Sequence, residues 1–208
     1  MRIGIVGSGS VGMSLARGFS GGGHEVMLGT RDPGKQVIGE WLAQAGPLAR
    51  VGTDREAVEF GEIVVPAIPG RLLPELVAEV GPDAFAGRIV VDPTNPTVMT
   101  DRGPEAAFGE DSSAAEYLTG VLPEARVVKA FDQVPAAEML DPANSEVRVM
   151  RIAGDDPEAK ATVAALLESF GWKVRDLGGV EMARKLEAGA LDWVRKRYEA
   201  RRASGEQR

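Results

Sequence analysis

A glycine-rich segment near the beginning of the chain has the spacing that binds the diphosphate of a dinucleotide. The pattern G-x-G-x-x-G is formed by Gly7, Ser8, Gly9, Ser10, Val11 and Gly12. In such a loop the first glycine permits a tight turn, the second lets the pyrophosphate approach the backbone, and the third lets a helix lie close to a strand. Amides at the start of that helix then hold the phosphates. Because a predicted strand precedes the pattern and a predicted helix follows it, a dinucleotide site is favoured over a purely structural glycine turn.

Two residues about 20 positions further on indicate which dinucleotide is bound. The next predicted strand ends with Thr30 and Arg31, where NAD-binding proteins usually carry a carboxylate for the ribose hydroxyls. A carboxylate would repel the additional phosphate of NADP, whereas a guanidinium binds phosphate through its charge and its paired donors. We therefore predict NADP(H) as the cofactor, with NAD(H) as the disfavoured alternative.

Further residues with useful chemistry follow the later strands of the predicted sheet. They are Ile68, Pro69, Thr94, Asn95, Lys129 and Asp132. Ligands of open parallel sheets bind at the carboxyl ends of the strands. Thr94 and Asn95 are therefore candidates to hydrogen-bond a nicotinamide or a substrate. Lys129 and Asp132 are candidate catalytic acids, and each is equally well explained as an ion-pair partner with a structural role.

The remaining ionisable candidates are assigned structural roles. His24 precedes a predicted strand on the amino side of the sheet, where packing in a turn is favoured over catalysis. Lys185 and Glu187, on the last predicted helix, are candidates to close the cleft, but a solvated helix face is favoured. Hydride transfer tolerates this scarcity of catalytic groups, because positioning is the main contribution that it asks of the protein.

The composition excludes several classes of function. The 208 residues include no cysteine and one histidine, so disulfides and cysteine-ligated metals are excluded and we predict no metal site. The net charge of −7 disfavours nucleic acid and anionic membranes as partners. No apolar run approaches the roughly 20 residues of a membrane helix, and no signal peptide precedes the first predicted strand. We therefore expect a cytoplasmic protein whose redox chemistry depends on an organic cofactor.

Short apolar runs alternate with helical patterns over the first two thirds of the chain. The predicted strands cover residues 3–6, 25–28, 50–52, 62–68, 88–91 and 126–131. Between them apolar residues repeat with helical spacing, as at Val11, Leu15 and Phe19. Capping-box spacings at residues 53–56 and 113–116 mark two helix starts. This alternation predicts an α/β Rossmann fold, a doubly wound parallel sheet with helices on both faces.

The last third of the chain predicts a smaller addition to this sheet. Strands are expected at residues 147–153 and 172–177, and a helix begins at Asp156, which is followed by a proline in the first turn. The apolar face of a last helix is formed by Met182, Leu186, Ala190 and Trp193. We predict an NADP(H)-binding domain over residues 1–143 and a small α/β extension over residues 144–208 packed on it. The tail at residues 200–208 is expected to be mobile.

An ordered set of segments resembles the F420-dependent NADP oxidoreductase family across nearly the whole chain. The segments are MRIGIVGSG at 1–9, GHEV at 23–26, GTR at 29–31, VDPTNP at 91–96, VKAF at 128–131, GDDPEAK at 154–160, DLG at 176–178 and ARKLE at 183–187. The resemblance implies a Rossmann domain with a small C-terminal α/β part, assembled as a homodimer. By that resemblance NADP is contacted by Gly9, Ser10, Val11, Thr30 and Arg31, and its nicotinamide half is bordered by Ile68 and Pro69.

The resemblance implies an NADP(H)-dependent oxidoreductase that transfers hydride between NADPH and a second cofactor such as coenzyme F420. One alternative is an NADPH reductase of a small organic imine or carbonyl compound in secondary metabolism. That reaction also needs a proton donor, for which Lys129 and Asp132 are the candidates. Another alternative is a non-catalytic NADP(H) sensor, which would bind the cofactor without turnover. In either enzyme the partner is a small-molecule hydride donor or acceptor.

Overall fold

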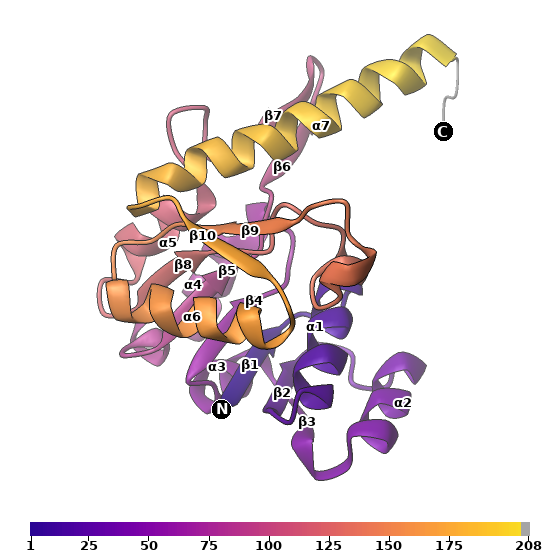
Figure 1. Ribbon diagram of the computed structural model, residues 1–208, viewed down its shortest axis with the longest axis vertical. Helices are drawn as coiled ribbons and strands as arrows, with labels where there is room; N and C mark the ends of the chain where they lie inside the picture. The colour runs from indigo at the N-terminus through magenta and orange to yellow at the C-terminus, as the bar shows by residue number, and fades with distance from the viewer. Residues whose placement is uncertain (205–208) are drawn as a thin grey trace.

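Six parallel strands form the central sheet, in the order β3-β2-β1-β4-β5-β8 (Figure 1). Their bounds are β1 (Arg2–Val6), β2 (Glu25–Gly29), β3 (Ala49–Gly52), β4 (Ile63–Pro66), β5 (Ile89–Asp92) and β8 (Arg126–Lys129). The computed structural model describes residues 1–204. The strand order reverses between β1 and β4, and ligands of such sheets bind in the crevice at this point. The predicted Rossmann fold is confirmed.

Helices cover both faces of the sheet, because successive side chains of a strand point to opposite faces. The helices are α1 (Ser10–Gly21), α2 (Gln36–Ala45) and α6 (Pro157–Ser169) on one face, and α3 (Asp54–Phe60), α4 (Leu73–Val80) and α5 (Ala114–Val121) on the other. On the first face Ile3 belongs to the same apolar cluster as Phe19 of α1. On the second face Val64 packs in a cluster with Leu76 of α4. The two clusters hold the ends of the strands, and thus the crevice, in place.

Two helix starts have the side-chain caps that the sequence predicted. The Oγ1 atom of Thr53 accepts a hydrogen bond from the amide of Glu56, and the Glu56 carboxylate accepts one from the amide of Thr53, which completes a capping box for α3. At the start of α5 the Oγ atom of Ser113 accepts from the amide of Glu116. There the Glu116 carboxylate accepts from the Ser113 hydroxyl group, with a distance of 2.9 Å between the two oxygens.

The last third of the chain adds a second, smaller sheet. Its elements are β9 (Val149–Ile152), β10 (Lys173–Asp176) and α7 (Ala183–Ser204). Two further strands lie earlier in the chain, β6 (Thr97–Thr100) and β7 (Gly103–Ala106). Short 3₁₀ turns along the whole chain are η1 (Gly46–Leu48), η2 (Gly70–Leu72), η3 (Pro82–Phe85), η4 (Ala136–Glu138), η5 (Pro142–Asn144) and η6 (Val180–Met182). Strands β9 and β10 pair in parallel, and a bridge between Lys129 and Ala153 joins β9 to the main sheet. Met150 and Ile152 of β9 join the apolar cluster that contains α1. A division of the chain at residue 143 stays a prediction.

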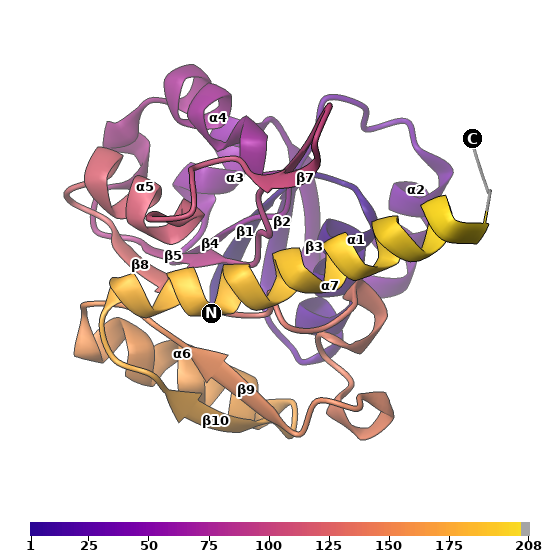
Figure 2. The same ribbon diagram turned by 90° about the horizontal axis from the view of Figure 1, so that it is seen from above.

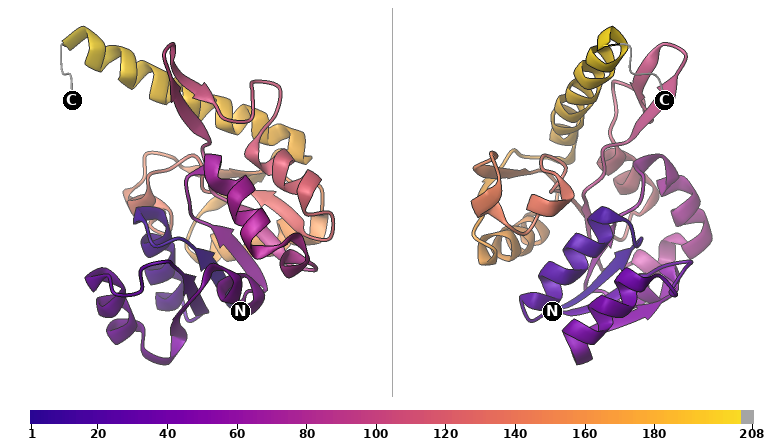
Figure 3. Two further views of the ribbon diagram at one scale, coloured as in Figure 1. Left: turned by 180° about the vertical axis from the view of Figure 1, so that it is seen from behind. Right: turned by 90° about the vertical axis from the view of Figure 1, so that its right-hand side faces the viewer.

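A hairpin that the sequence did not predict stands beside the last helix. Strands β6 and β7 pair antiparallel, and the hairpin rises next to α7 (Figure 3). The guanidinium of Arg195 on α7 donates a hydrogen bond to the carbonyl oxygen of Pro104 on β7, at 3.1 Å. Figure 2 shows α7 crossing the molecule from α5 to beyond the sheet. The hairpin and α7 therefore form an upper layer above the carboxyl ends of the strands.

The predicted apolar face of the last helix is wrong at Trp193, which is 58% exposed. The buried apolar residues of α7 are Ala183, Leu186 and Leu191. The exposed ring of Trp193 packs against the guanidinium of Arg197 on the same helix, which lies 4.7 Å from the ring centroid. Residues 200–204 of the expected mobile tail belong to α7, and residues 205–208 lie outside the described part. Among the described residues, no helix has the length and apolar character that crossing a membrane would require.

Candidate active site

The glycine loop leaves an open surface at the start of α1. Gly7 adopts a positive φ of 106°, a conformation that favours glycine and turns the chain out of β1. A Cβ atom on Gly12 would collide with the carbonyl oxygen of Gly7, so glycine lets the helix close onto the loop. No described atom lies within 4 Å of the position that a Cβ on Gly9 would take, and no described side chain caps α1. The first amides of α1 are therefore available to an anion.

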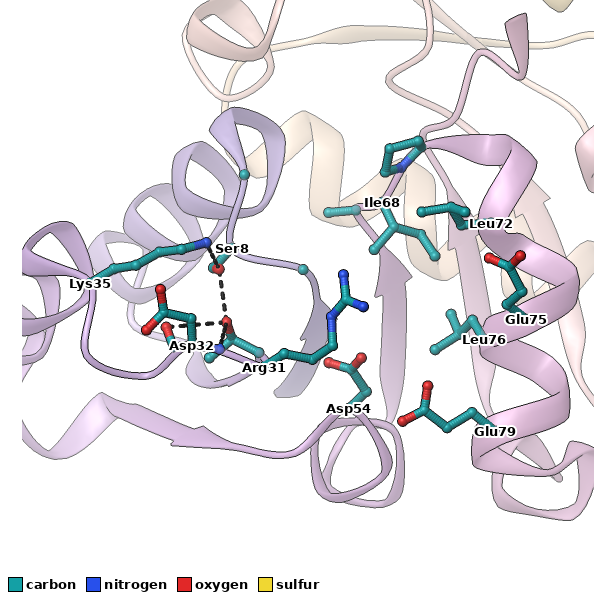
Figure 4. A pocket seen from close by; sticks show the side chains of 15 residues that line it. Ser8, Arg31, Asp32, Lys35, Asp54, Ile68, Leu72, Glu75, Leu76 and Glu79 are labelled. Atoms are coloured by element: carbon teal, nitrogen blue, oxygen red, sulfur yellow. Dashed lines mark hydrogen bonds between the residues drawn. The ribbon is translucent and has the colours of Figure 1, made fainter. Parts of the chain in front are cut away.

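Ser8, Thr30 and Lys35 form a connected polar cluster beside this surface (Figure 4). The hydroxyl oxygens of Ser8 and Thr30 are 2.8 Å apart, and Nζ of Lys35 donates a hydrogen bond to Oγ of Ser8 at 2.8 Å. Sequence reasoning missed Lys35, although a second cation just before the second predicted helix was a usable signal. The side chain of Arg31 extends from the other side of the cluster toward Asp54 and Ile68 (Figure 4).

These residues line the first cavity, which has a volume of about 450 Å³. Its lining consists of Gly7, Ser8, Gly9, Thr30, Arg31, Asp32, Lys35, Asp54, Ala67, Ile68, Pro69, Leu72, Glu75, Leu76 and Glu79. Ile68 and Pro69 follow β4, so the first cavity runs from the end of β2 across the glycine loop to the end of β4. Ser10, Val11 and Gly12 lie in the first turn of α1, directly behind the loop. The structure thus brings the predicted cofactor residues together.

The wall of the first cavity opposite Lys35 is acidic. Glu75 and Glu79 of α4 and Asp54 of α3 line it (Figure 4). Burial raises the pKa of Asp54, and the nearby Glu79 carboxylate adds to this increase while Arg31 opposes it. A phosphate group fits the side with Lys35 and the two hydroxyl groups, whereas hydrogen-bond donors such as an adenine amino group fit the acidic wall.

Lys129, a candidate acid, is the last residue of β8 and is completely buried. Its Nζ atom donates to Oδ2 of Asp92 at 2.9 Å, to Oε1 of Glu187 at 2.6 Å and to the carbonyl oxygen of Thr94. An ammonium group has three donors, and all three are used. Burial acts to lower the pKa of Lys129, but the surrounding carboxylates of Asp92, Glu187 and Asp132 outweigh it and hold the pKa above its usual range. This geometry favours the ion-pair role for Lys129.

The other candidates at these strand ends surround the same ion pair. Asn95 is exposed, and its Nδ2 atom donates to the carbonyl oxygen of Asp132 at 2.7 Å. Two buried oxygens, Oγ1 of Thr94 and Oδ2 of Asp132, have no hydrogen-bond partner among the described residues. Burial raises the pKa of Asp132. Between Lys129 and Asp132, Phe131 has a φ of 69°, a strained conformation of the kind that clusters at functional sites.

Glu187 does not lie on a solvated helix face, which corrects the sequence-based expectation. Its side chain is 10% exposed, and its carboxylate accepts hydrogen bonds from Lys129 and from the amide of Ala114 at the start of α5. The two partners lie 58 and 73 residues away in the sequence, so no local pattern signals them. Lys185, two positions earlier on α7, is exposed as expected.

Asn95 and Glu187 also line the second cavity, which has a volume of about 290 Å³. Its lining consists of Asn95, Pro96, Thr97, Ala106, Gly109, Glu110, Ser112, Arg184, Glu187, Ala188, Leu191, Asp192 and Arg195. The chain around the hairpin forms one side and α7 forms the other. Gly70, next to Pro69 of the first cavity, lies so close to Pro96 that an added Cβ would be 2.7 Å from the Pro96 Cβ. The two cavities therefore lie next to each other, and the packed contact between Gly70 and Pro96 forms part of the wall between them.

The remaining ionisable candidate lies away from both cavities. His24 packs between the rings of Phe19 and Phe170, with ring centroids 6.3 and 6.4 Å away. Burial lowers its pKa, and the nearby N-terminal amino group adds to this decrease. Its surroundings agree with the packing role assigned from the sequence. Within residues 1–204, no three histidine, cysteine or acidic side chains are grouped in a way that would hold a metal ion.

Comparison with known proteins assigns the chain to a family. The family model described as NADP oxidoreductase coenzyme F420-dependent matches residues 2–96. The F420-dependent NADP reductase of Methanothermobacter marburgensis is 30% identical over 198 residues, which cover 90% of this chain and 88% of that protein. The chain belongs to the F420-dependent NADP oxidoreductase family. It is an NADP-dependent oxidoreductase, as the resemblance of its sequence segments implied.

Two further relatives of this F420-dependent NADP oxidoreductase family member extend the comparison. A crystal structure from Arthrobacter sp. FB24, named as a candidate F420-dependent NADP reductase, superposes with a TM-score of 0.85 at 31% identity, over 93% of this chain and 91% of that one. The Metalloreductase STEAP3 of Rattus norvegicus is 33% identical over 187 residues, or 90% of this chain and 36% of that protein. The chain thus spans about a third of the length of STEAP3.

The residues of the first cavity fit the dinucleotide that this oxidoreductase family uses. The space above Gly9 is free of described atoms where a pyrophosphate would touch backbone, and α1 offers uncapped amides. Lys35 and the hydroxyl groups of Ser8 and Thr30 supply hydrogen-bond donors for an additional phosphate. Ile68 and Pro69 line the first cavity, and the unpartnered hydroxyl oxygen of Thr94 lies close to the next residue, Gly70, 3.0 Å from where a Cβ would stand. NADP supplies a hydride donor or acceptor carbon when it is bound.

Proposed function

We propose that this protein transfers hydride between NADPH and coenzyme F420. The proposal rests on the two neighbouring cavities at the carboxyl ends of the strands. The first cavity has the hydrogen-bond donors that a dinucleotide needs, and the second offers space for another ring system. The name of the Methanothermobacter relative, which is covered over 88% of its length, supports the choice of F420. Hydride transfer between two stacked rings depends mainly on their positioning.

In this proposal each group of residues has a stated role. The backbone at Gly7 and Gly9 and the start of α1 hold the pyrophosphate, while Ser8, Thr30, Arg31 and Lys35 bind the additional phosphate. Ile68 and Pro69 form the apolar border of the nicotinamide. Thr94 and Asn95 orient the nicotinamide carboxamide, using the unpartnered hydroxyl oxygen of Thr94 and the exposed amide of Asn95. Lys129 fixes the ends of β5 and β8 through its ion pairs.

A second candidate function is the reduction of a small organic imine or carbonyl compound by NADPH. It is favoured by the two nearly buried carboxyl groups of Asp132 and Glu187, whose pKa values burial raises. A carboxyl group that keeps its proton near neutral pH can deliver it to nitrogen or oxygen. The homodimer and the cytoplasmic location that the sequence analysis proposed stay predictions.

The acceptor is identified by following anaerobic NADPH oxidation against a panel of F420, flavins, cyclic imines and carbonyl compounds. We expect F420 to give the highest kcat/KM, and heat-denatured protein serves as the control. A higher kcat/KM with an imine or carbonyl compound moves the assignment to the organic reductase. NADPH binding without oxidation by any member of the panel overturns the enzymatic proposal for these acceptors.

A further inference from the structure

The second cavity contains a carboxyl group that is placed to exchange a proton with a bound molecule. Glu187 lines this cavity together with Asn95, which also borders the Asp132 loop at the strand ends. Its side chain is 90% buried by the ion pair with Lys129 and by α5, and the small exposed part belongs to the wall of the second cavity. Glu187 therefore connects a buried charge network to a space that opens to solvent.

We propose that Glu187 donates the proton that the acceptor takes up when it is reduced in the second cavity. The inference rests on the proposed function, in which NADPH is the hydride source. The C–H bond of NADPH breaks and a C–H bond forms at the acceptor carbon, while an electron pair moves to a nitrogen or oxygen of the acceptor. The O–H bond of Glu187 then breaks and an N–H or O–H bond forms on that atom. The carboxylate regains its proton from water.

The neighbouring ionisable groups are less suited to this step. All three donors of Lys129 are already directed to Asp92, Thr94 and Glu187, and its side chain is completely buried. Asp132 is buried and does not line either cavity. In contrast, Oε2 of Glu187 has only a shared hydrogen bond with the amide of Ala114. Oε2 is therefore the oxygen that carries the proton.

The surroundings of Glu187 let a substantial fraction of the molecules keep its proton near neutral pH. One ammonium group, on Lys129, faces three buried carboxyl groups from β5, the segment after β8, and α7, so it does not balance all of them. Burial raises the pKa of Glu187 to about 7; Lys129 opposes this increase and Asp92 adds to it. Arg184, on the same helix and cavity wall, is held by a hydrogen-bonded ion pair with Glu116 of α5. Farther along the second cavity the charged groups are Glu110, Asp192 and Arg195.

Glu187→Gln tests the proposal because glutamine keeps the size of the side chain and an oxygen that accepts from Lys129 and Ala114. The experiment measures kcat for NADPH oxidation with F420 and with a cyclic imine as acceptors. The pH is varied from about 5.5 to about 9, roughly the range around neutral pH in which such a group titrates. In the wild type we expect kcat to fall as the pH rises above about 7. Glu187→Gln should lower kcat about 100-fold, the scale of a lost general acid, and remove this pH dependence. The dissociation constant of NADPH should not change.

A second variant and a control separate proton donation from a merely structural role. Glu187→Asp keeps a carboxyl group, so it should restore part of kcat and show a displaced pH limb. Glu199→Gln removes an exposed carboxyl group from the outer half of α7, and kcat should stay unchanged. A structural role alone would lower kcat in Glu187→Gln without changing its pH dependence. Infrared difference spectra of the protein without acceptor should show a carboxyl band that titrates near pH 7 and is absent from Glu187→Gln.

The outcomes distinguish this inference from the proposed function. Wild-type turnover combined with an unchanged pH profile of Glu187→Gln overturns the proton-donor role and leaves the hydride-transfer proposal intact. The absence of the titrating carboxyl band also overturns the role, whatever the acceptor. A wild-type protein that oxidises no NADPH with F420 or with the imine overturns both proposals.

Discussion

In the proposed NADP(H) site, Ser8, Thr30 and Lys35 on one side of the first cavity and Arg31 on the other are positioned to select the dinucleotide. Ser8 and Thr30 share a hydrogen bond, Lys35 donates to Ser8, and Arg31 lies on the other side of this pair. These are the donors that a phosphate on the adenosine ribose needs, and none of them is a carboxylate. Asp32 contributes its backbone amide to Thr30, so it serves the turn after β2.

NADPH should bind at least about tenfold more tightly than NADH, and Arg31→Ala should reduce this preference. The expected loss of NADPH affinity is about 1–3 kcal/mol, the scale of a charge-assisted hydrogen bond. Lys35→Ala should act in the same direction, and neither change should weaken NADH binding. Quenching of tryptophan fluorescence measures both affinities. Lys185→Ala, an exposed lysine on α7, is the control, and equal affinities of the wild type for NADPH and NADH would contradict the assignment.

Sequence could identify these residues only where their roles depend on local position. Thr30 and Arg31 were predictable because they end the second strand, a position that the glycine pattern defines. Lys35 was missed although it is a cation just before the second predicted helix, and only the structure shows its hydrogen bond to Ser8, 27 residues away. Glu187 was misjudged because its environment is created by α5 and β8, which no spacing within α7 reports.

At the scale of elements, Gly9 and Gly12 have different roles where the glycine loop meets α1. The Cβ position of Gly9 is open, whereas that of Gly12 is occupied by the backbone of Gly7. One glycine therefore keeps space for a ligand, and the other keeps the helix against the loop. The two tasks can be separated by mutation.

Gly9→Val should abolish most NADPH binding while the melting temperature without ligand stays within about 2 °C, a shift worth about 0.5–1 kcal/mol for a chain of this size. Its branched side chain would fill the space that a pyrophosphate needs, but it meets no described atom within 4 Å of its Cβ. Gly12→Ala is the matched comparison, and it should lower the melting temperature because the new Cβ collides with Gly7. Calorimetry without and with NADPH checks both. A collapse of stability in Gly9→Val would show that Gly9 is needed for the fold instead.

The elements differ in how far sequence alone could predict them. Strands β4 and β5 are continuous apolar runs, because both faces of a parallel sheet are covered, and this pattern is visible without a structure. Strands β6 and β7 have four residues each, are only partly buried and include Pro104, so no apolar pattern marks them. Their contact with α7 joins Pro104 to Arg195, 91 residues away in the sequence.

At the scale of the whole molecule, Glu187 links α7 to two other elements through hydrogen bonds. Its carboxyl group accepts from the amide of Ala114 at the start of α5 and from Lys129 at the end of β8. The same carboxyl group forms part of the second cavity wall, so the position of α7 and the shape of that cavity are linked. Protonation of this group therefore affects the stability of the fold as well as the proposed chemistry.

Glu187 should contribute a fall in the free energy of unfolding as the pH rises from about 4.5 through about 7. The folded protein holds a proton on Glu187 up to a pKa of about 7, whereas the unfolded chain releases it near 4.5. Because the folded state binds more protons in this range, raising the pH destabilises it. Urea denaturation at several pH values should show a decline on the order of 2 kcal/mol, shallower in Glu187→Gln. Identical slopes in the two proteins would contradict a raised pKa of Glu187.

The two adjoining cavities draw their walls from separate stretches of the chain. The first uses residues between Gly7 and Glu79, and the second uses residues between Asn95 and Arg195. Substitutions that change one cavity therefore need not disturb the other. Substitutions on the hairpin and α7 can therefore change which acceptor is used, while the affinity for the dinucleotide stays the same. Relatives that differ along α7 but keep the Ser8, Thr30 and Lys35 cluster are then expected to share a hydride source and to differ in what they reduce.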